Sequence, residues 1–315
     1  MKKSAYITRY AAMGDHIHAS HLPRLLKEDG YDYVCFEYNP KGKAIYANNP
    51  FIDEHIVFDP NTPGVSDKPI SYLTKRYEQI MKRRGFTKHF NLMNSIERGY
   101  IAMEDQNEYY ESSVERRNKF GGHNYYDQTS IFAGYGHKVG TKGDLFFTEG
   151  EDILVRRVYE ERYSNKFVII CNLSGTSKHK LFFNAETIIK SFLKRHPEAV
   201  CITMGDEEAR KHLDFIGDRV INRAGKFILD GDEKGSSYYP FRQSMLMTKY
   251  ANMVIGCESG LMVAATLLGV PTVQLMTAAS IKNHGGDFEN DYSLQSPVTC
   301  SPCHKGPYEY IGCPK

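Results

Sequence analysis

Residues 254–273, VIGCESGLMVAATLLGVPTV, constrain the fold more than any other part of this sequence. An apolar run is followed by a short polar turn, a stretch with helical spacing and a second apolar run. The middle stretch places apolar residues on one helical face, at Leu261, Ala264, Ala265 and Leu268. Gly269 and Pro271 come next, where a helix that leads into a strand is expected to end. The segment therefore predicts a strand–helix–strand unit of an α/β fold.

Small and acidic residues stand where this predicted helix begins, at Glu258, Ser259 and Gly260. The first amides of a helix lack acceptors within the helix and lie at the positive end of its dipole, so they bind phosphate well. The same residues also fit an ordinary strand–helix–strand packing unit without a ligand. The segment alone leaves both interpretations open.

The composition is that of a soluble globular chain with a sizeable core. Of the 315 residues, 41% are hydrophobic and 25% are charged, which fits two domains or one large domain. The net charge of +2 argues against a protein that coats nucleic acid, although it allows local basic patches. Residues 1–9 carry two lysines without an apolar run behind them, and no window approaches a membrane span. We therefore expect a cytoplasmic protein, either free or peripheral at the inner face of the membrane.

Strand and helix signals alternate along the second half of the chain. Strands are expected at 166–171, 199–203 and 219–221, and helices after Asn184, from Gly205 to Leu213 and at 244–250. This alternation predicts a parallel sheet with helices on both faces. The first part resembles a looser version, with strands at 5–8, 32–37 and 54–58, a helix from Gly14 to about Lys27 and another at 72–84. We place the boundary at residue 160, which divides the chain into domains 1–160 and 161–315.

Polar motifs follow four predicted strands, at Gly14–Asp15, Ser174–Lys180, Gly205–Glu208 and Glu258–Gly260. The carboxyl ends of parallel strands lie at one edge of a sheet, and open α/β sheets bind ligands outside that edge. We therefore expect two Rossmann-like domains with parallel sheets that face each other across a ligand-binding cleft.

The order and spacing of five short motifs resemble glycosyltransferase family 9, the heptosyltransferase family of lipopolysaccharide core assembly. The motifs are Ala12–Asp15, Asn49–Glu54, Ile221–Lys226, Glu258–Leu261 and Cys300–Cys303 with residues 312–314. The resemblance covers nearly the whole chain and implies the GT-B fold. It further implies that residues 1–160 bind the acceptor and residues 161–315 bind a nucleotide sugar.

The resemblance also implies a role for each matching residue. Asp15 would be the general base that deprotonates the acceptor hydroxyl, and Lys180 would pair with the donor diphosphate. The donor would further be held by residues of three loops, which are Ser174, Thr176, Gly205, Glu208, Glu258, Ser259, Gly260 and Leu261. The family inverts the anomeric carbon and needs no metal or other cofactor. The expected donor is an ADP-sugar, with a UDP-sugar as the alternative.

Two positions at the expected donor site differ from the family pattern. Glu258 stands where the family has Asp, and Val263 stands where it has His. The donor is therefore expected to be ADP-heptose-like rather than ADP-heptose itself. Family members also usually continue with a helix after the cysteine segment, so this chain either lacks that helix or is shortened.

Some of these residues also have a purely structural interpretation. Asp15 at a helix start is a good N-cap, and a lysine in a surface loop usually has no special role. Lys178 is the alternative to Lys180 as the diphosphate partner. The sequence therefore leaves both a functional and a structural role open for Asp15 and for Lys180.

A cluster of histidines, His16, His18 and His21, adjoins Asp15. Clustered imidazoles suit zinc, which predicts a metal-dependent hydrolase as the rival function. On one helix, however, His18 and His21 share a face while His16 and His18 point apart. We therefore favour an acceptor contact for His16 and His18 over a metal site.

The C-terminal cysteines Cys300, Cys303 and Cys313 have zinc-like spacing, with His304 as the nearest fourth ligand. A single Cys-x-x-Cys pair with one more cysteine is a weak zinc signal. Disulfides are rare in the cytoplasm, so we expect free thiols, with structural zinc as the alternative.

Two further segments are candidates for acceptor binding. The basic residues at 75, 76, 82–84 and 88, with Arg83 among them, form either a solvated helix face or a patch that attracts an anionic acceptor. Residues 100–135 are rich in tyrosine, whose aromatic faces can stack on sugars or bases. This segment is therefore a candidate acceptor-binding loop, with Tyr125 as its candidate contact residue. A surface excursion with buried tyrosines fits the same pattern.

The sequence thus predicts an inverting, metal-independent glycosyltransferase that transfers a sugar from a nucleotide diphosphate to an acceptor hydroxyl. The acceptor is expected to be lipopolysaccharide core or another saccharide. A variant with the same chemistry would glycosylate hydroxylated bases of phage DNA, with nucleic acid as the acceptor. A sugar-nucleotide-binding protein without catalytic activity is the remaining option.

Overall fold

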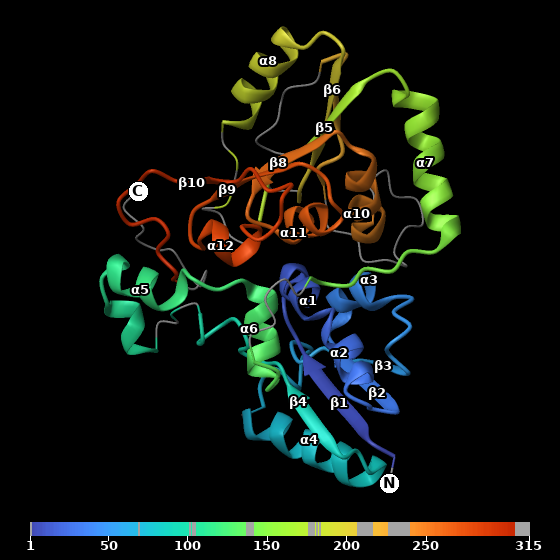
Figure 1. Cartoon of the computed structure of the whole chain (residues 1–315), viewed down its shortest axis with the longest axis vertical. Helices are drawn as coiled ribbons and strands as arrows, with labels where there is room; N and C mark the ends of the chain where they lie inside the picture. Colours follow the sequence, from blue (N-terminus) through green and yellow to red (C-terminus); the bar gives the residue numbers. More distant parts are fainter. Residues whose placement is uncertain are drawn as a thin grey trace. The chain divides into compact units, whose positions relative to one another are not determined.

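The chain folds into two compact units (Figure 1). The computed structural model describes residues 2–68, 70–100, 102, 105–136, 142–175, 180, 182, 184–206, 217–225 and 240–305, without the side chain of Ile70. The first unit comprises Met1–Ser95 and Tyr126–Phe146, and the second comprises Ile96–Tyr125 and Phe147–Lys315. Each unit is built around its own parallel sheet.

The sheet of the first unit has four parallel strands in the order β3-β2-β1-β4. Their bounds are Ser4–Arg9 for β1, Tyr33–Tyr38 for β2, Glu54–Val57 for β3 and Lys88–Asn91 for β4. The chain moves from β1 to β2 on one side and later returns to place β4 on the other side. The carboxyl ends of β1 and β4 therefore flank a topological switch point, the place where such sheets bind ligands.

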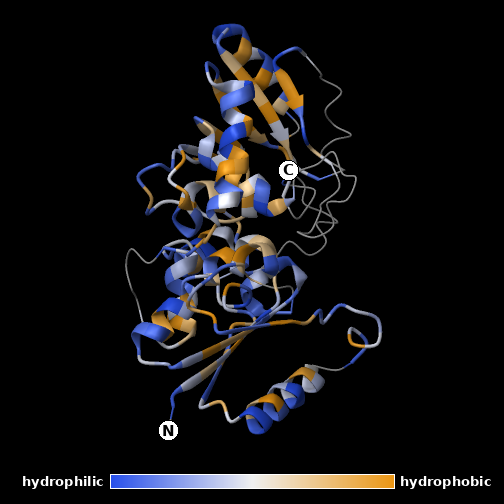
Figure 2. Ribbon diagram, turned by 90° about the vertical axis from the view of Figure 1, so that its right-hand side faces the viewer, coloured by the Kyte–Doolittle hydropathy of each residue, from blue (hydrophilic) through white to orange (hydrophobic). Residues whose placement is uncertain are grey.

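Short helices surround this sheet. They are α1 (Met13–Ala19), α2 (Leu22–Glu28), η1 (Pro40–Gly42), α3 (Lys43–Tyr46), α4 (Ile70–Arg84) and α6 (Tyr125–Phe132), whose first residue belongs to the second unit. Helix α4 is amphipathic (Figure 2). Its side chains Leu73, Tyr77 and Met81 pack against Tyr6 and Phe86, and this contact fixes the helix on the sheet.

The sheet of the second unit has six parallel strands in the order β10-β9-β8-β5-β6-β7. Their bounds are Phe167–Asn172 for β5, Ala199–Met204 for β6, Val220–Asn222 for β7, Met253–Cys257 for β8, Thr272–Met276 for β9 and Leu294–Gln295 for β10. The chain moves from β5 to β6 in one direction and from β8 to β9 in the other. The switch point of this sheet therefore lies between β5 and β8.

The helices of the second unit that the structure describes are η2 (Asn107–Tyr110), α5 (Ser113–Phe120), α7 (Glu149–Tyr163), α8 (Ala185–Arg195), α10 (Phe241–Tyr250), α11 (Gly260–Leu267) and α12 (Ile281–His284). Helix α8 buries Ile189 and Leu193 against Ile169 and Cys201 of β5 and β6. Right-handed crossovers that run in opposite directions place α8 and α11 on opposite faces of the sheet. The predicted parallel sheet with helices on both faces is thus confirmed.

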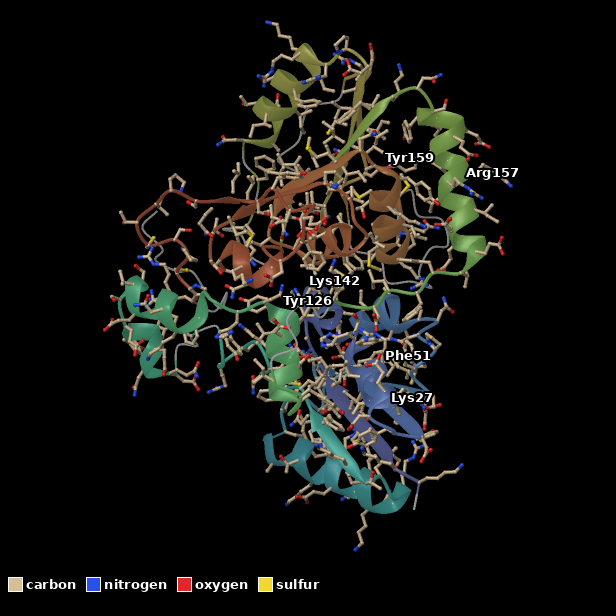
Figure 3. All side chains as sticks on the ribbon, in the orientation of Figure 1. Lys27, Phe51, Tyr126, Lys142, Arg157 and Tyr159 are labelled. Atoms are coloured by element: carbon tan, nitrogen blue, oxygen red, sulfur yellow. The ribbon has the colours of Figure 1, made fainter. Side chains whose placement is uncertain are left out.

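Helix α7 packs against α10 in the second unit (Figure 1). The Tyr159 hydroxyl donates to the carbonyl of Met247 at 2.7 Å, and the Tyr159 side chain is labelled on α7 in Figure 3. Arg242 of α10 forms an ion pair with Glu151 in the first turn of α7. These contacts assign α7 to the second unit, whereas the sequence suggested a boundary at residue 160 that divides this helix.

Residues 96–125 also belong to the second unit, because they are fastened to its C-terminal segment. The buried Arg116 side chain donates to the carbonyl of Cys303, and the Arg117 side chain donates to that of Ser301 at 3.0 Å. Asn283 donates to the carbonyls of Phe120 and His123 at 2.9 and 2.7 Å. Residues 96–125, an insertion in the first half of the sequence, are thus held by residues near the C-terminal end of the chain. No local sequence pattern predicts such long-range contacts.

Most of the expected strands are confirmed, and three differences have clear causes. Strand β4 carries one buried residue among four and β10 has only two residues, so neither shows an apolar pattern. The helix expected to run to about Lys27 is divided into α1 and α2, and Ser20 donates to the carbonyl of Ile17 at the break. The helix expected from Gly205 to Leu213 lies mostly outside the described residues.

Candidate functional site

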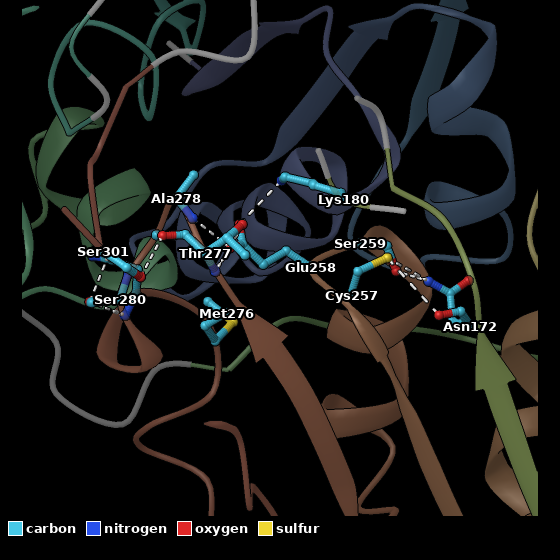
Figure 4. Close-up of polar contacts among 12 residues, drawn as sticks. Asn172, Lys180, Cys257, Glu258, Ser259, Met276, Thr277, Ala278, Ser280 and Ser301 are labelled. Carbon is cyan, nitrogen blue, oxygen red and sulfur yellow. Dashed lines mark hydrogen bonds and ion pairs between the residues drawn. The ribbon is translucent and has the colours of Figure 1, made fainter. Parts of the chain in front are cut away.

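The candidate site lies in the second unit, where β5, β8 and β9 end (Figure 4). We call it the switch-point site and define it by Asn172, Ser174, Lys180, Glu258, Ser259, Thr277 and Ala278. These residues come from three loops that are far apart in the sequence. Hydrogen bonds and one ion pair link side chains of these loops, so the sheet topology and not the sequence order brings them together.

Two glycines allow the strand ends to approach each other closely. A Cβ atom at Gly256 would lie 2.2 Å from the carbonyl oxygen of Asn172, between β8 and β5. A Cβ atom at Gly175 would lie 2.6 Å from the carbonyl oxygen of Glu258 and 2.8 Å from Cδ of Lys180. No side chain fits at either distance, so these positions require glycine.

The amide of Asn172 ties the loop after β5 to the start of α11. Its Nδ2 donates to the carbonyl of Ser174 at 2.8 Å and to Oγ of Ser259 at 2.9 Å. Ser259 is the N-cap of α11, and its Oγ accepts from the amide of Met262 at 3.4 Å. The side chain of Ser259 therefore fixes the beginning of this helix.

Glu258 is the most buried charged group of the switch-point site, with 2% of its surface exposed. Its Oε1 accepts from the hydroxyl of Thr277 at 3.0 Å, from the amide of Ala278 at 2.8 Å and from the amide of Thr277. Its Oε2 lies 3.2 Å from Nζ of Lys180 (Figure 4). Both carboxylate oxygens are thus used within the protein.

The surroundings of Glu258 keep it ionised. Burial alone would raise the pKa of this carboxyl group, but the charge of Lys180, the proximity of His284 and the amide of Thr277 lower the pKa to about 2. Burial in turn lowers the pKa of His284 to about 4. At neutral pH Glu258 is therefore ionised and the imidazole of His284 is neutral.

The loop after β6 joins the same edge. Oγ of Ser174 accepts from the amide of Asp206 at 3.0 Å, and Gly205 has a φ of 148° that favours glycine. The carbonyl of Gly205 accepts from the amide of Gly225, in the loop after β7. The post-strand loops with Ser174, Gly205 and Glu258 do converge as predicted.

Not every predicted donor residue presents its side chain to this edge. Leu261 is 5% exposed and belongs to the core, so only its backbone is available to a ligand. Gly260 is half-buried at the first turn of α11. Thr176, Lys178 and Glu208 lie outside the described residues.

The sequence did not single out Asn172, Thr277 or Ala278. Asn172 is the only polar residue at the end of the apolar run of β5, which is a usable signal. Thr277 and Ala278 act through backbone amides at the end of β9, and no side-chain pattern predicts such a role.

Asp15 lies in the first turn of α1, after β1, as predicted. Its Oδ2 accepts from the amide of Ala12 at 3.2 Å, and Ala12, not Asp15, is the N-cap of α1. The carboxylate therefore supports the helix start from the N3 position instead of the N-cap position that the sequence suggested as the alternative. The side chain is one quarter exposed. Nη2 of the buried Arg9 lies 3.9 Å from Oδ1, and Nη1 of Arg9 donates to the carbonyl of Leu92 at 2.7 Å, after β4. The switch point of the first unit thus carries a carboxylate and a buried guanidinium that the sequence did not reveal.

His16 is fully buried and structural. Asn39 donates to the carbonyl of Ala11 at 3.0 Å, so its Oδ1 accepts from Nε2 of His16 at 2.7 Å. Nδ1 of His16 lies 3.1 Å from the hydroxyl of Tyr46. Burial lowers the pKa of His16 to about 3, so the imidazole is neutral at physiological pH. The predicted acceptor contact through this side chain does not fit its burial.

The other two histidines of the cluster have different surroundings. The ring of His18 is 1% exposed and packs edge-on against Tyr126, which Figure 3 labels, with 4.8 Å between the ring centroids. Nε2 of His21 lies 2.8 Å from Oγ of Ser130. His18 and His21 thus both contact α6, whereas His16 contacts Asn39 and Tyr46, so the three imidazoles do not converge as a ligand set.

The remaining acceptor candidates differ in exposure. Arg83 lies on the exposed face of α4 and lines a shallow hollow together with Tyr72, Lys75 and Arg76. Tyr125 is 3% exposed and packs against Met276 in the second unit. Arg83 is thus accessible to an anionic acceptor, whereas the ring of Tyr125 belongs to the core.

Cys300 and Cys303 are half-buried, and Cys313 lies outside the described residues. His304 is buried, and its ring lies near Phe120, with 6.0 Å between the ring centroids. Within the described ranges, no three His, Cys, Asp or Glu side chains are grouped so that they could hold a metal ion.

Known structures share the architecture of this chain. A family 9 glycosyl transferase from Veillonella parvula has a TM-score of 0.66 at 16% identity, and the match covers 93% of this chain and 87% of that one. The chain has the fold of the family 9 glycosyltransferases. The ADP-heptose lipopolysaccharide heptosyltransferase II of E. coli has a TM-score of 0.61 at 12% identity, with 94% and 91% covered. The iron-containing dodecameric glycosyltransferase TibC of enterotoxigenic E. coli also has a TM-score of 0.61, at 10% identity, with 100% and 69% covered.

These likenesses confirm the predicted GT-B fold. Neither a protein-family model nor a curated protein sequence matches the chain. Among the helices that the structure describes, none is both long enough and apolar enough to cross a bilayer.

Proposed function

We propose that this protein is a glycosyltransferase that takes a sugar from a nucleotide-diphosphate donor. The observation that carries the proposal is the switch-point site, where the ammonium of Lys180 and the first turn of α11 lie at the carboxyl ends of β5 and β8. Cations and the N-termini of helices stabilise phosphate. The fold supports the same conclusion, because the proteins that share it are glycosyltransferases by name.

The donor that fits best is an ADP-sugar of the ADP-heptose type, with a UDP-sugar as the alternative. Heptosyltransferase II, which has the same fold, is named for ADP-heptose. Lys180 and the helix start would bind the diphosphate, and the loops at Ser174 and Gly205 would lie near the nucleoside. Val263 stands where that family has His, so the sugar need not be heptose.

The reaction would be a single displacement with inversion at the anomeric carbon. Asp15 would accept the proton of the acceptor hydroxyl while the oxygen forms its bond to the anomeric carbon. The bond from that carbon to the diphosphate breaks, and the diphosphate leaves with the electron pair. Lys180 and the helix amides would stabilise the charge that develops on the leaving group.

The acceptor is expected to be a saccharide, with lipopolysaccharide core as the first candidate. The exposed basic residues of α4, including Lys75 and Arg83, suit an anionic acceptor. A hydroxylated base in phage DNA would suit the same charge. Strong salt dependence of DNA binding would favour the DNA acceptor over the saccharide.

A thermal-shift panel of nucleotides and nucleotide sugars tests the proposal. A ligand present at 100 times its dissociation constant stabilises the folded protein by about 2.7 kcal/mol. ADP or UDP should therefore raise the melting temperature, and Lys180→Ala should remove most of the increase. Glu78→Gln, on the exposed face of α4, is the matched control and should leave it unchanged. The proposal fails if no nucleoside diphosphate or nucleotide sugar stabilises the wild-type protein.

A further inference from the structure

Both carboxylate oxygens of Glu258 have partners within the protein, which limits what the residue can do for a ligand. One oxygen accepts from the Thr277 hydroxyl and from two backbone amides, and the other pairs with Lys180. With 2% of the residue exposed, no sugar hydroxyl reaches the carboxylate without displacing one of these partners. Displacing a partner would leave a buried polar group unsatisfied, which is costly.

We propose that Glu258 is a positioning residue that holds Lys180 in place for the donor diphosphate and does not contact the donor sugar. The inference rests on the proposed function, because it concerns the same diphosphate. In this role Glu258 contributes to binding of the diphosphate, which is the leaving group, and does not help to select the sugar.

The length of the side chain fits this role. Glu258 follows β8, while the amides of Thr277 and Ala278 follow the neighbouring strand β9. The carboxylate therefore spans the ends of two adjacent strands and still reaches Lys180 at 3.2 Å. An aspartate, which is one methylene shorter, could not keep all of these contacts with the same backbone.

Lys180 is held from two sides and stays accessible. Gly175 lies so close that a Cβ atom there would be 2.8 Å from Cδ of Lys180, which means that the backbone at Gly175 packs against the lysine stem. Its side chain is 15% exposed. An ammonium has three donors, so one can stay on Glu258 while the others bind phosphate.

Titration calorimetry with ADP and ADP-glucose separates this role from a sugar contact. A uridine pair, UDP and UDP-glucose, replaces them if the thermal-shift panel selects uridine. Glu258→Gln should weaken the binding of ADP and of ADP-glucose by the same factor, about tenfold or more. The reason is that Lys180 is no longer held in place for its charge-assisted contact with the diphosphate. In a Lys180→Ala background the same substitution should change neither affinity by more than about twofold, since the residue acts through the lysine.

Each other outcome overturns the inference. Glu258 contacts the sugar if Glu258→Gln weakens ADP-glucose and leaves ADP unchanged. It has no positioning role if neither affinity changes, or if the losses of the two single variants add fully in the double variant. If the glutamine variant does not fold, Glu258→Asp gives the same comparison of ADP with ADP-glucose. A wild-type protein that binds no nucleoside diphosphate contradicts the proposed function itself, and the inference fails with it.

Discussion

The buried carboxylate of Glu258 predicts how the stability of the protein depends on pH. Glu258→Gln keeps an acceptor oxygen for Thr277 and Ala278 but removes the negative charge beside Lys180. Glutamine does not titrate, so the stability difference between the wild type and this variant reports the ionisation of Glu258.

The magnitude follows from the pKa of this group. The pKa of Glu258 is lowered from 4.5 to about 2, which corresponds to about 3 kcal/mol at about 1.4 kcal/mol per unit. Because the folded-state pKa is the lower one, this stabilisation is complete above pH 4.5 and is lost as the pH falls towards 2. Glu258→Gln should therefore be about 3 kcal/mol less stable at pH 7, and the difference should shrink by about 1.4 kcal/mol per pH unit below 4.5.

Urea unfolding from pH 7 to pH 3.5, followed by far-UV circular dichroism, measures this difference. The chain has no tryptophan, so intrinsic fluorescence reports only tyrosine. Glu78→Gln removes an exposed carboxylate from α4 and serves as the matched control, for which we expect a small difference at every pH.

Two results would contradict this prediction for Glu258→Gln. A Glu258→Gln variant as stable as the wild type at pH 7 would mean that the ion pair with Lys180 contributes nothing. A stability difference that is large but constant down to pH 3.5 would mean that packing, and not the charge, is responsible for it.

Three further predictions concern other parts of the molecule. Gly256→Ala should destabilise the protein by about 1–3 kcal/mol in urea unfolding, since its Cβ atom would lie 2.2 Å from the carbonyl of Asn172, and an unchanged midpoint would contradict the close approach. Arg76→Ala should lower the melting temperature markedly, because the fully buried Glu37 loses its ion-pair partner at a cost of about 3–5 kcal/mol, whereas an equal melting temperature would show that the pair is dispensable. Asp15→Asn should preserve nucleotide affinity and circular dichroism while transfer falls by about a hundredfold or more, and a variant with full transfer activity would exclude Asp15 as the base.

The regular part of the fold was predictable because its strands are continuous apolar runs. Phe167–Asn172 and Ala199–Met204 are almost entirely buried, and burial on both faces leaves a strong sequence pattern. Lys88–Asn91 is a strand of the first sheet with one buried residue, so it leaves no such pattern. Hydrophobic pattern thus predicts the central strands and the edge strands β3 and β7, but it misses β4 and the two-residue β10, where few residues are buried.

The convergence of the post-strand loops was predictable, whereas the contacts of their side chains were not. Loops that follow parallel strands must lie at one edge, which is why the loops at Ser174, Gly205 and Glu258 lie together. The partners of Glu258 are backbone amides at the end of β9, and a backbone donor has no sequence signature.

The histidine cluster shows the same limit in the first unit. His16, His18 and His21 are close in the sequence, but His16 is bound by Asn39 while the rings of His18 and His21 both contact α6. A single-helix projection of this segment therefore did not describe the environments of these side chains. Tertiary contacts determine such environments, and spacing alone does not encode them.

A structure of the protein with bound ADP would show where the diphosphate binds. We expect the diphosphate at the switch-point site, within hydrogen-bond distance of Nζ of Lys180 and of a backbone amide in the first turn of α11, while Glu258 still accepts from Thr277 and Ala278. This expectation is contradicted if the diphosphate is bound elsewhere on the chain, or if it is bound with Lys180 turned away from it.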